Sequence, residues 1–230
     1  MTEWWTYRLS DFALFSARVY ERLIELHNHA LWPLHIPALA LGLTLIWLLA
    51  RPTPAARRIV PGMIGAAWLW IAWSFFWRSY ATINWAAPYL APAIALQGLL
   101  LLWLGAVRGS FVIRAAPMVR SAALSLLAGS VLLYPLIAPA LGRSWRAGEF
   151  FGIAPDPTAL ATLAALAAGS GWSRWALCIL PALWCALSGA TLWAIGAEGY
   201  WIPPLAGALA LILSVAGRSG AGASPPARIL

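Results

Sequence analysis

The stretch Ala86–Val107 reads AAPYLAPAIALQGLLLLWLGAV, and it carries no charged side chain before Arg108. A helix needs about 20 mostly apolar residues to cross the hydrocarbon core of a bilayer. This stretch has that length, so it predicts a transmembrane helix.

Other stretches of similar composition lie on both sides of it. Five of them meet or nearly meet the same requirement: 31–50, 59–77, 121–141, 175–195 and 201–217. A seventh, Pro157–Gly171, is short. It either crosses where the bilayer thins locally or forms a re-entrant helix. The sequence therefore predicts an all-α integral membrane protein with a bundle of about seven transmembrane helices.

Composition supports this class. Hydrophobic residues make up 62% of the chain, and charged residues only 10%, whereas soluble domains have about a quarter of their residues charged. The net charge of +8 comes from arginines dispersed through short loops. That dispersal argues against a nucleic-acid surface and favours topology signals and contacts with anionic lipids. Membrane lipids and other membrane-protein subunits are the expected partners.

The arginines also predict an orientation. If the short stretch crosses, one side holds nine arginines and no acid, and the other side holds all seven acids. The nine are Arg51, Arg57, Arg58, Arg108, Arg114, Arg120, Arg174, Arg218 and Arg228. Because arginine-rich loops stay in the cytoplasm, we expect a bacterial inner-membrane protein with a periplasmic N-terminus and a cytoplasmic C-terminus. If the short stretch does not cross, the last two helices reverse.

The two ends of the chain are expected to lie outside the transmembrane bundle. Met1–Trp5 lacks the basic start of a signal peptide, so no cleavable leader is expected. From a cap at Ser10, an amphipathic helix is predicted to run to His29 on the outer surface. Its apolar stripe is Phe12, Phe15, Val19, Leu23 and Leu26. The expected units are therefore 1–30, the bundle 31–217 and a disordered cytoplasmic tail 218–230.

No metal, cofactor or catalytic residue is predicted. His27 and His29 are two apart and do not share a helix face, while Cys178 and Cys185 are too far apart along one helix to pair. The chain has no lysine, which excludes a retinal Schiff base. No hydrolase, metalloprotease or nucleotide-binding fingerprint stands in the required context.

Polar residues near the outer helix ends are the candidate ligand-binding site. Asn28, His29, Asn84 and Asp156 are all expected near that interface, with Gln97 deeper as the floor of a cavity. An aromatic wall from Trp70, Trp73 and Trp77, which share one face of the second span, is the alternative site, suited to a flat or hydrophobic ligand. The full candidate set is Asn28, His29, Trp32, Trp73, Trp77, Arg78, Asn84, Gln97 and Asp156.

Four short motifs resemble an uncharacterised family of bacterial polytopic inner-membrane proteins, known only as a domain of unknown function. They are Asn28–Pro33 (NHALWP), Ile83–Ala87 (INWAA), Gln97-Gly98 and Gly152–Thr158 (GIAPDPT). The family pattern has tyrosine before the first asparagine, where this chain has His27. The resemblance implies a multi-helix membrane protein, supplies no activity and highlights Asn28, Trp32, Asn84, Gln97 and Thr158.

Two functions remain open at this stage. The first is a non-enzymatic membrane protein, either an accessory subunit of a larger complex or a small-solute permeation protein. The alternative is a membrane enzyme or a redox or quinone-binding module that uses the outer polar and aromatic pocket around Glu25, His29, Arg78 and Asn84.

Overall fold

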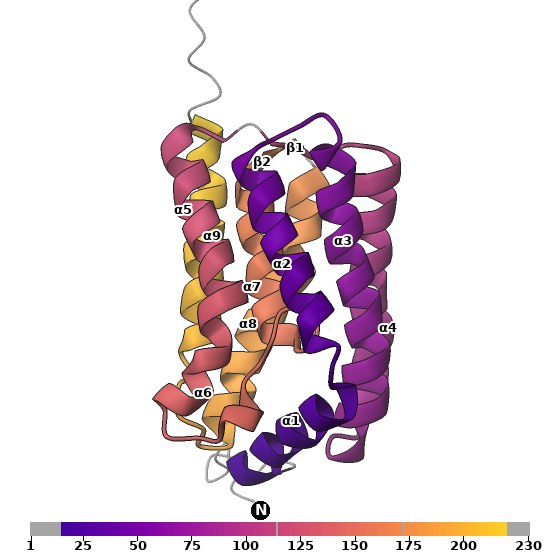
Figure 1. Ribbon diagram of the computed structural model, residues 1–230, viewed down its shortest axis with the longest axis vertical. Coiled ribbons are helices and arrows are strands. Elements are labelled where there is room, and N and C mark those ends of the chain that lie inside the picture. The colour runs from indigo at the N-terminus through magenta and orange to yellow at the C-terminus, as the bar shows by residue number, and fades with distance from the viewer. Residues whose placement is uncertain (1–14, 114, 172, 220–230) are drawn as a thin grey trace, which may run out of the picture.

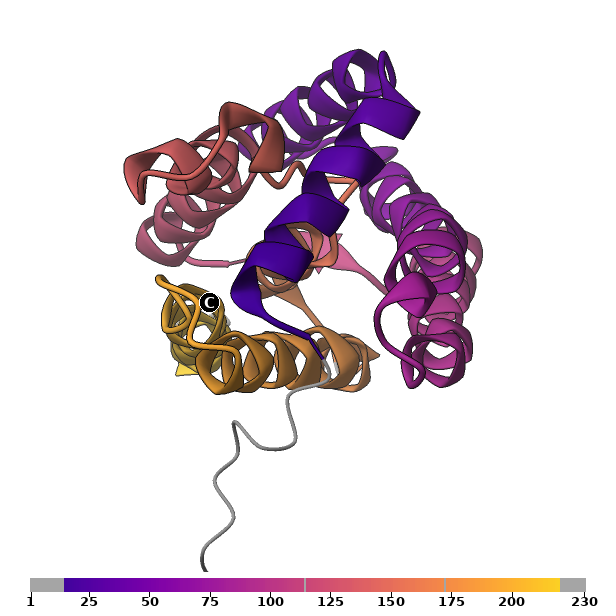
Figure 2. The same cartoon turned by 90° about the horizontal axis from the view of Figure 1, so that it is seen from below.

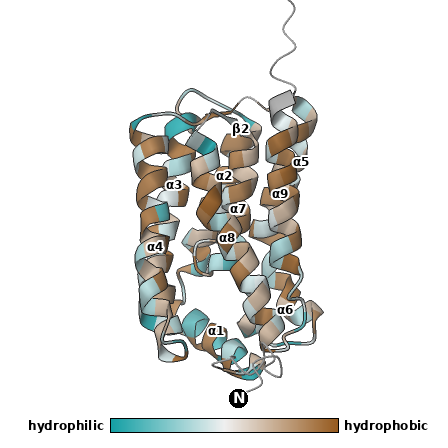
Figure 3. Cartoon of the chain, turned by 180° about the vertical axis from the view of Figure 1, so that it is seen from behind, coloured by the Kyte–Doolittle hydropathy of each residue, from teal (hydrophilic) through white to brown (hydrophobic). Residues whose placement is uncertain are grey.

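The structure, a computed structural model, describes residues 15–113, 115–171 and 173–219. Within these ranges the chain forms a bundle of long helices (Figure 1). A helix lies across one end of the bundle, and a short antiparallel sheet closes the other end (Figure 1). Hydrophobic residues are concentrated along the helix shafts (Figure 3).

The long elements run along the axis of the bundle. They are α2 (His35–Ala50), α3 (Ala56–Ile71) with η3 (Ala72–Ser79) and η4 (Tyr80–Thr82), α4 (Ala87–Leu100) with η5 (Leu101–Val107), α5 (Pro117–Ala128) with η6 (Gly129–Leu133), η7 (Tyr134–Leu136) and α6 (Ile137–Ala140), α7 (Pro155–Ala167), α8 (Ser173–Ala194) and α9 (Ile202–Ser219). The sheet pairs β1 (Val112–Ile113) with β2 (Gly169–Ser170), and Val112 lies opposite Ser170.

Four continuous helical runs are long and apolar enough to cross a membrane. They are Ala56–Thr82, Ala87–Val107, Pro117–Ala140 and Ser173–Ala194. The pair α1 (Ala17–Leu31) and α2 meets the same requirement together, although it bends by 94° at the break. Ile202–Gly217 is a shorter apolar helix. The predicted all-helical fold with several apolar spans is confirmed.

Helix α1 covers the end of the bundle, as Figure 2 shows from below. It begins after Ser16, whose hydroxyl accepts a hydrogen bond from Val19 N and so satisfies a free N–H of the first turn. The predicted cap at Ser10 and the stripe residue Phe12 lie outside the described residues. The chain then turns into α2 through Trp32–Leu34.

The prediction of the apolar face of α1 was only partly right. Leu23 is buried, but Val19 and Leu26 are 41% and 53% exposed. The buried face consists of Tyr20, Leu23, Ile24, His27 and Asn28. The face is rotated toward the two polar residues because their side chains bond to backbone carbonyls beneath the helix.

Helix α7 lies in the centre of the bundle, against α3, α5, α8 and α9. Each of its residues, from Pro155 to Ala167, is buried. Most of them are Ala, Thr or Leu, and small side chains let several neighbouring helices approach closely. At 1.5 Å per residue, its 13 residues are too few to cross a hydrocarbon core of about 30 Å alone.

Two glycines allow α3 and α4 to pack backbone against backbone. A Cβ at Gly65 would lie 2.8 Å from Gly98 O, and a Cβ at Gly98 would lie 2.7 Å from Gly65 O. A side chain at either position would therefore push the helices apart. Small residues at such crossings are typical of helix pairs in membranes.

Candidate functional site

The residues from Ser144 to Thr158, called here the inserted segment, lead from the α1 end into the centre of the bundle. The segment opens with the short helix η8 (Trp145–Ala147), continues without regular structure, and ends in the first turn of α7. Non-helical backbone inside a helical bundle must find hydrogen-bond partners among side chains.

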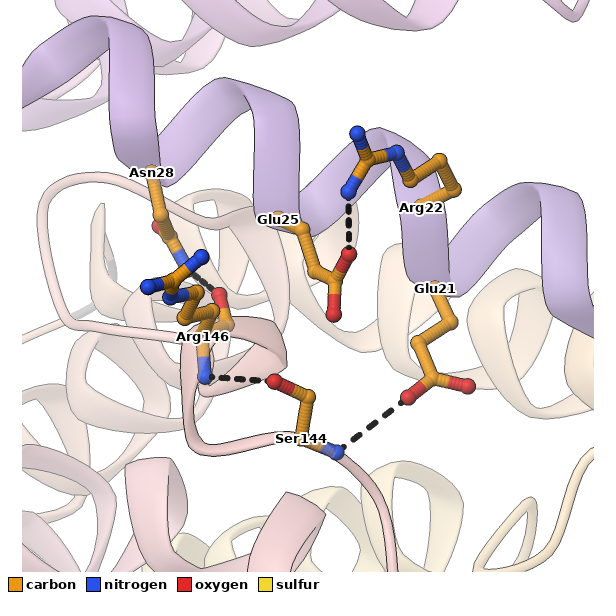
Figure 4. Close-up of polar contacts among 6 residues, drawn as sticks. All are labelled: Glu21, Arg22, Glu25, Asn28, Ser144 and Arg146. Carbon is orange, nitrogen blue, oxygen red and sulfur yellow. Dashed lines mark hydrogen bonds and ion pairs between the residues drawn. The ribbon is translucent and has the colours of Figure 1, made fainter.

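Helix α1 supplies several of these partners. Asn28 Nδ2 donates to the carbonyls of Arg146 and Gly148, at 2.7 Å each. His27 Nε2 lies 3.3 Å from Ile153 O, and Glu21 accepts from Ser144 N at 3.3 Å. Figure 4 shows the contacts of Asn28 and Glu21, which join α1 to the start of the segment.

The far end of the segment is fixed by its own residues. Gly152 has a φ of +75°, a left-handed conformation that glycine adopts without strain. Its N–H donates to Thr158 Oγ1 at 2.8 Å, and that hydroxyl donates to Ala154 O at the same distance. The motif Gly152–Thr158 therefore forms the turn that begins α7, and the motif Asn28–Pro33 supplies the asparagine that holds the preceding loop.

A pocket of about 480 Å³ opens between α1, the start of α2 and the inserted segment. We call it the α1 pocket. Its lining residues are Glu25, Asn28, His29, Trp32, His35, Trp145, Arg146 and Phe150. The volume falls in the range of small-molecule sites.

The α1 pocket combines aromatic surface with both signs of charge. Trp32 and Trp145 are exposed at its rim, and the rings of His35 and Phe150 meet edge to face at 4.7 Å. Glu25 accepts from Arg22 at 2.8 Å (Figure 4). This bond is the main reason that the pKa of Glu25 is lowered, so the carboxylate stays negative beside Arg146.

The structure brings three of the predicted site residues into this pocket: Asn28, His29 and Trp32. Trp73 and Trp77 instead lie half-exposed on the outside of the bundle. The Arg78 guanidinium lies 5.3 Å from the Trp73 ring centroid. These three side chains do not line the α1 pocket.

Asn84 and Gln97 lie elsewhere and have structural partners. Asn84 Oδ1 accepts from Ala86 N at 2.9 Å, just before α4 begins. Gln97 is fully buried, and its Nε2 donates to Leu177 O at 2.9 Å. Gln97 therefore connects α4 to α8 rather than flooring the α1 pocket.

Asp156 lies deeper than the sequence indicates. It was expected near the outer interface because it directly precedes the short stretch that begins at Pro157, but it is only 1% exposed. Its carboxylate accepts from Trp184 Nε1 and Ser188 Oγ at 2.7 Å, and from Tyr134 OH at 3.2 Å. Tyr134 and Trp184 were missed, because the contacts join positions far apart in the sequence.

A second acid lies near Asp156. Glu149 is 8% exposed, and its Oε2 has no hydrogen-bond partner among the described residues. With Tyr134, Arg143 and Glu198, it lines a small cavity of about 20 Å³. The shortness of Pro157–Gly171 and its run of small residues were the signals in the sequence for a buried helix beside these acids.

An apolar groove of about 380 Å³ lies between α2 and α3, lined in part by Leu41, Ala66 and Trp70. The Trp70 and Trp73 ring centroids are 5.3 Å apart. Part of the expected aromatic wall thus borders a hydrophobic groove. Among the described residues, no group of three or more His, Cys, Asp or Glu side chains could hold a metal ion.

Comparison with known proteins places the chain in a family. No curated protein and no solved structure matches it. A family model described as "Family of unknown function (DUF6064)" matches residues 17–223. This range includes the α1 pocket, the inserted segment and every helix that the structure describes. The chain therefore belongs to this family, as its sequence motifs indicated.

Proposed function

We propose that the protein crosses the bacterial inner membrane seven times and binds a small zwitterionic molecule in the α1 pocket, without transforming it. The observation that carries the binding role is the pocket itself: about 480 Å³, aromatic, and lined by one acidic and one arginine side chain.

Seven crossings follow if the inserted segment and α7 together make one passage. The four long helical runs, α2, which bends away from α1 by 94°, and the shorter α9 supply the rest. Irregular backbone is tolerated at membrane depth only when protein buries it. The helices around α7 would bury this passage and supply its packing and hydrogen-bond partners.

The charges support an orientation for these crossings. The loops at the sheet end carry Arg51, Arg108 and their neighbours, while the α1 end carries Glu21, Glu25 and Glu198. The rule that arginine-rich loops stay inside puts the sheet end in the cytoplasm. The α1 pocket then faces the periplasm.

The lining of the pocket suits a ligand with both charges. An ammonium group is attracted to the faces of Trp32 and Trp145 and to the Glu25 carboxylate. A carboxylate or phosphate on the same molecule pairs with Arg146. A ligand of one charge would leave one of these side chains unmatched.

Binding fits the geometry better than permeation or catalysis. A permeation path must pass α7, whose residues are all buried in the centre of the bundle. The pocket lining that the structure describes offers imidazoles and a carboxylate but no Ser, Thr or Cys nucleophile. A hydroxyl or thiol nucleophile activated by a neighbouring base is therefore not part of this lining.

Tryptophan fluorescence of the detergent-purified protein tests this proposal, because Trp32 and Trp145 line the pocket. The probes are phosphocholine, choline and inorganic phosphate. Phosphocholine should bind tightest. Glu25→Gln should weaken binding of choline and phosphocholine, and Arg146→Gln that of phosphate and phosphocholine, by roughly tenfold or more each, as expected for lost bonds to charged groups.

Arg18→Gln is the matched control, since Arg18 is exposed on α1 and lies outside the pocket. Added phosphatidylcholine distinguishes a lipid headgroup from a free solute, because it competes with phosphocholine only if lipid reaches the pocket. No response to any probe, or equal binding by the wild type and both pocket variants, would refute the proposal.

A further inference from the structure

The bundle buries two carboxylates that ligand binding in the α1 pocket does not use. Asp156 and Glu149, called here the acid pair, are 1% and 8% exposed and interact electrostatically. Two buried carboxylates that repel each other cannot both stay ionised without a large cost. One of the two carboxylates must therefore carry the negative charge while the other is protonated.

The surroundings of Asp156 favour its ionised form. Its oxygens accept three hydrogen bonds, from Trp184, Ser188 and Tyr134. It also stands in the first turn of α7, where the partial positive charge of the helix N-terminus stabilises an anion. Protonation of Asp156 would weaken these three hydrogen bonds, because a carboxyl is a poorer acceptor than a carboxylate. The negative charge of the pair therefore resides on Asp156.

Glu149 has different surroundings. Its Oε2 is buried and has no hydrogen-bond partner within the part of the chain that the structure describes, and the same is true of Arg143 Nε. Both side chains line the cavity of about 20 Å³, which has room for about one water molecule. A water there can accept from Arg143 and donate to Glu149, so the cavity provides both a partner for these atoms and a route for a proton.

We propose that the acid pair holds one exchangeable proton, which resides on Glu149 and arrives from the α1 end through this water-sized cavity. In the uptake step the Glu149 carboxylate forms an O–H bond to a proton donated by hydronium in the cavity, which leaves as water. Release is the reverse step. Asp156 keeps its negative charge throughout, and Glu198, at the cavity wall, is the last acid on the way to the surface.

The groups that face the pair from neighbouring elements do not compete for this proton. They are Tyr20 on α1, Tyr80 on η4, Tyr134 on η7, Cys185 on α8 and Arg143 in the loop after α6. Phenols and thiols lose their protons only well above neutral pH, and arginine keeps its charge. A carboxyl is thus the group of this cluster that exchanges a proton near neutrality.

Infrared spectroscopy of the detergent-purified protein during a pH titration tests the proposal, because a protonated carboxyl has a carbonyl band that a carboxylate lacks. The wild type should show one titrating buried-carboxyl band, and Glu149→Gln should remove it. Arg143→Gln should move its midpoint to higher pH, and Asp156→Asn to lower pH, since each removes a neighbouring charge. Arg18→Gln, exposed on α1 and outside the cavity, should change nothing.

Transfer of the wild type to D₂O adds a measurement that depends on no variant. Because the cavity connects Glu149 to water, the carboxyl band should shift promptly to its deuterated position. The proposal is overturned by the absence of any such band while the protein is folded, by a band that survives Glu149→Gln, or by a band that does not exchange in D₂O. None of these outcomes depends on whether a ligand binds in the α1 pocket.

Discussion

Asn28 and His27 are the two buried polar side chains through which α1 holds the inserted segment. Each replaces a hydrogen bond that regular secondary structure would otherwise supply: Asn28 binds two carbonyls at the start of the segment, and His27 binds Ile153 O near its end. The neutral His27 ring donates through Nε2, so its Nδ1 can accept from Ser79 Oγ at 2.8 Å.

Replacing Asn28 should therefore destabilise the protein. Asn28→Ala leaves the Arg146 and Gly148 carbonyls without this partner, and each unsatisfied buried group costs about 1–3 kcal/mol. The expected result is a clearly lower Tm in detergent. His29→Ala changes an exposed neighbour and should stay near the wild-type value. An unchanged Tm for Asn28→Ala would show that the segment does not depend on this side chain.

The charge state of His27 predicts how stability depends on pH. The pKa of His27 is lowered from 6.5 to about 4: burial is the largest cause, the bond to Ile153 opposes it, and His35 adds a smaller lowering effect. The unfolded chain takes up the proton near pH 6.5, but the folded protein does so only near pH 4. Stability is therefore full above pH 6.5 and is lost as the pH falls toward 4, by about 3 kcal/mol in total.

The difference in Tm between the wild type and His27→Gln across pH 4–7 isolates this effect, because the other acids titrate equally in both proteins. The wild type should lose Tm more steeply over this range than the variant does. Parallel curves would mean that His27 is not held neutral by its surroundings.

At the scale of elements, the sequence predicts the helices far better than it predicts their faces. Residues 86–107 were expected as one helix, and the structure has Ala87–Val107, because an apolar run of this length is enough to define a span. The polar residues on the buried face of α1 could not be predicted in the same way. Asn28 and Gly148 are 120 positions apart, and hydropathy carries no information about such contacts.

The same reasoning explains the misplacement of Asp156. Pro155 and Pro157, on either side of Asp156, indicate a helix start, and α7 does begin there. Most helix starts in a chain of this kind lie at the membrane interface. Here the helix starts inside the bundle, where Trp184 and Ser188 on α8 donate hydrogen bonds to the Asp156 carboxylate. The depth of a helix start depends on the path of the preceding loop, which local sequence does not specify.

The buried face of α1 predicts which substitutions weaken the packing of this helix on the bundle. Ile24 is buried against the bundle, whereas Val19 is 41% exposed. Ile24→Asp loses apolar burial worth about 1.5–3 kcal/mol and also buries a charge. We expect faster proteolysis within residues 17–31 for this variant, with Val19→Asp close to the wild type. Equal protection of both variants would indicate that α1 does not dock through this face.

At the scale of the whole molecule, the two ends of the bundle differ in charge. The buried acids, the α1 pocket and the surface acids Glu21, Glu25 and Glu198 belong to the α1 end. The loops at the sheet end carry arginines without acids. Both proposed sites therefore lie at the same end of the bundle, which the orientation we propose places in the periplasm.

This orientation is open to a direct test with reporters. A reporter fused after Arg218 should read cytoplasmic, and a tag before Trp4 should be accessible from the periplasm, because the seven crossings that we propose put these two points on opposite sides. The control is a reporter in the loop at Gly142, which should read periplasmic. If the inserted segment and α7 return to the side from which they entered, the Gly142 fusion stays periplasmic while the Arg218 fusion becomes periplasmic too. That outcome would make the segment a re-entrant element and place the basic end of α9 outside.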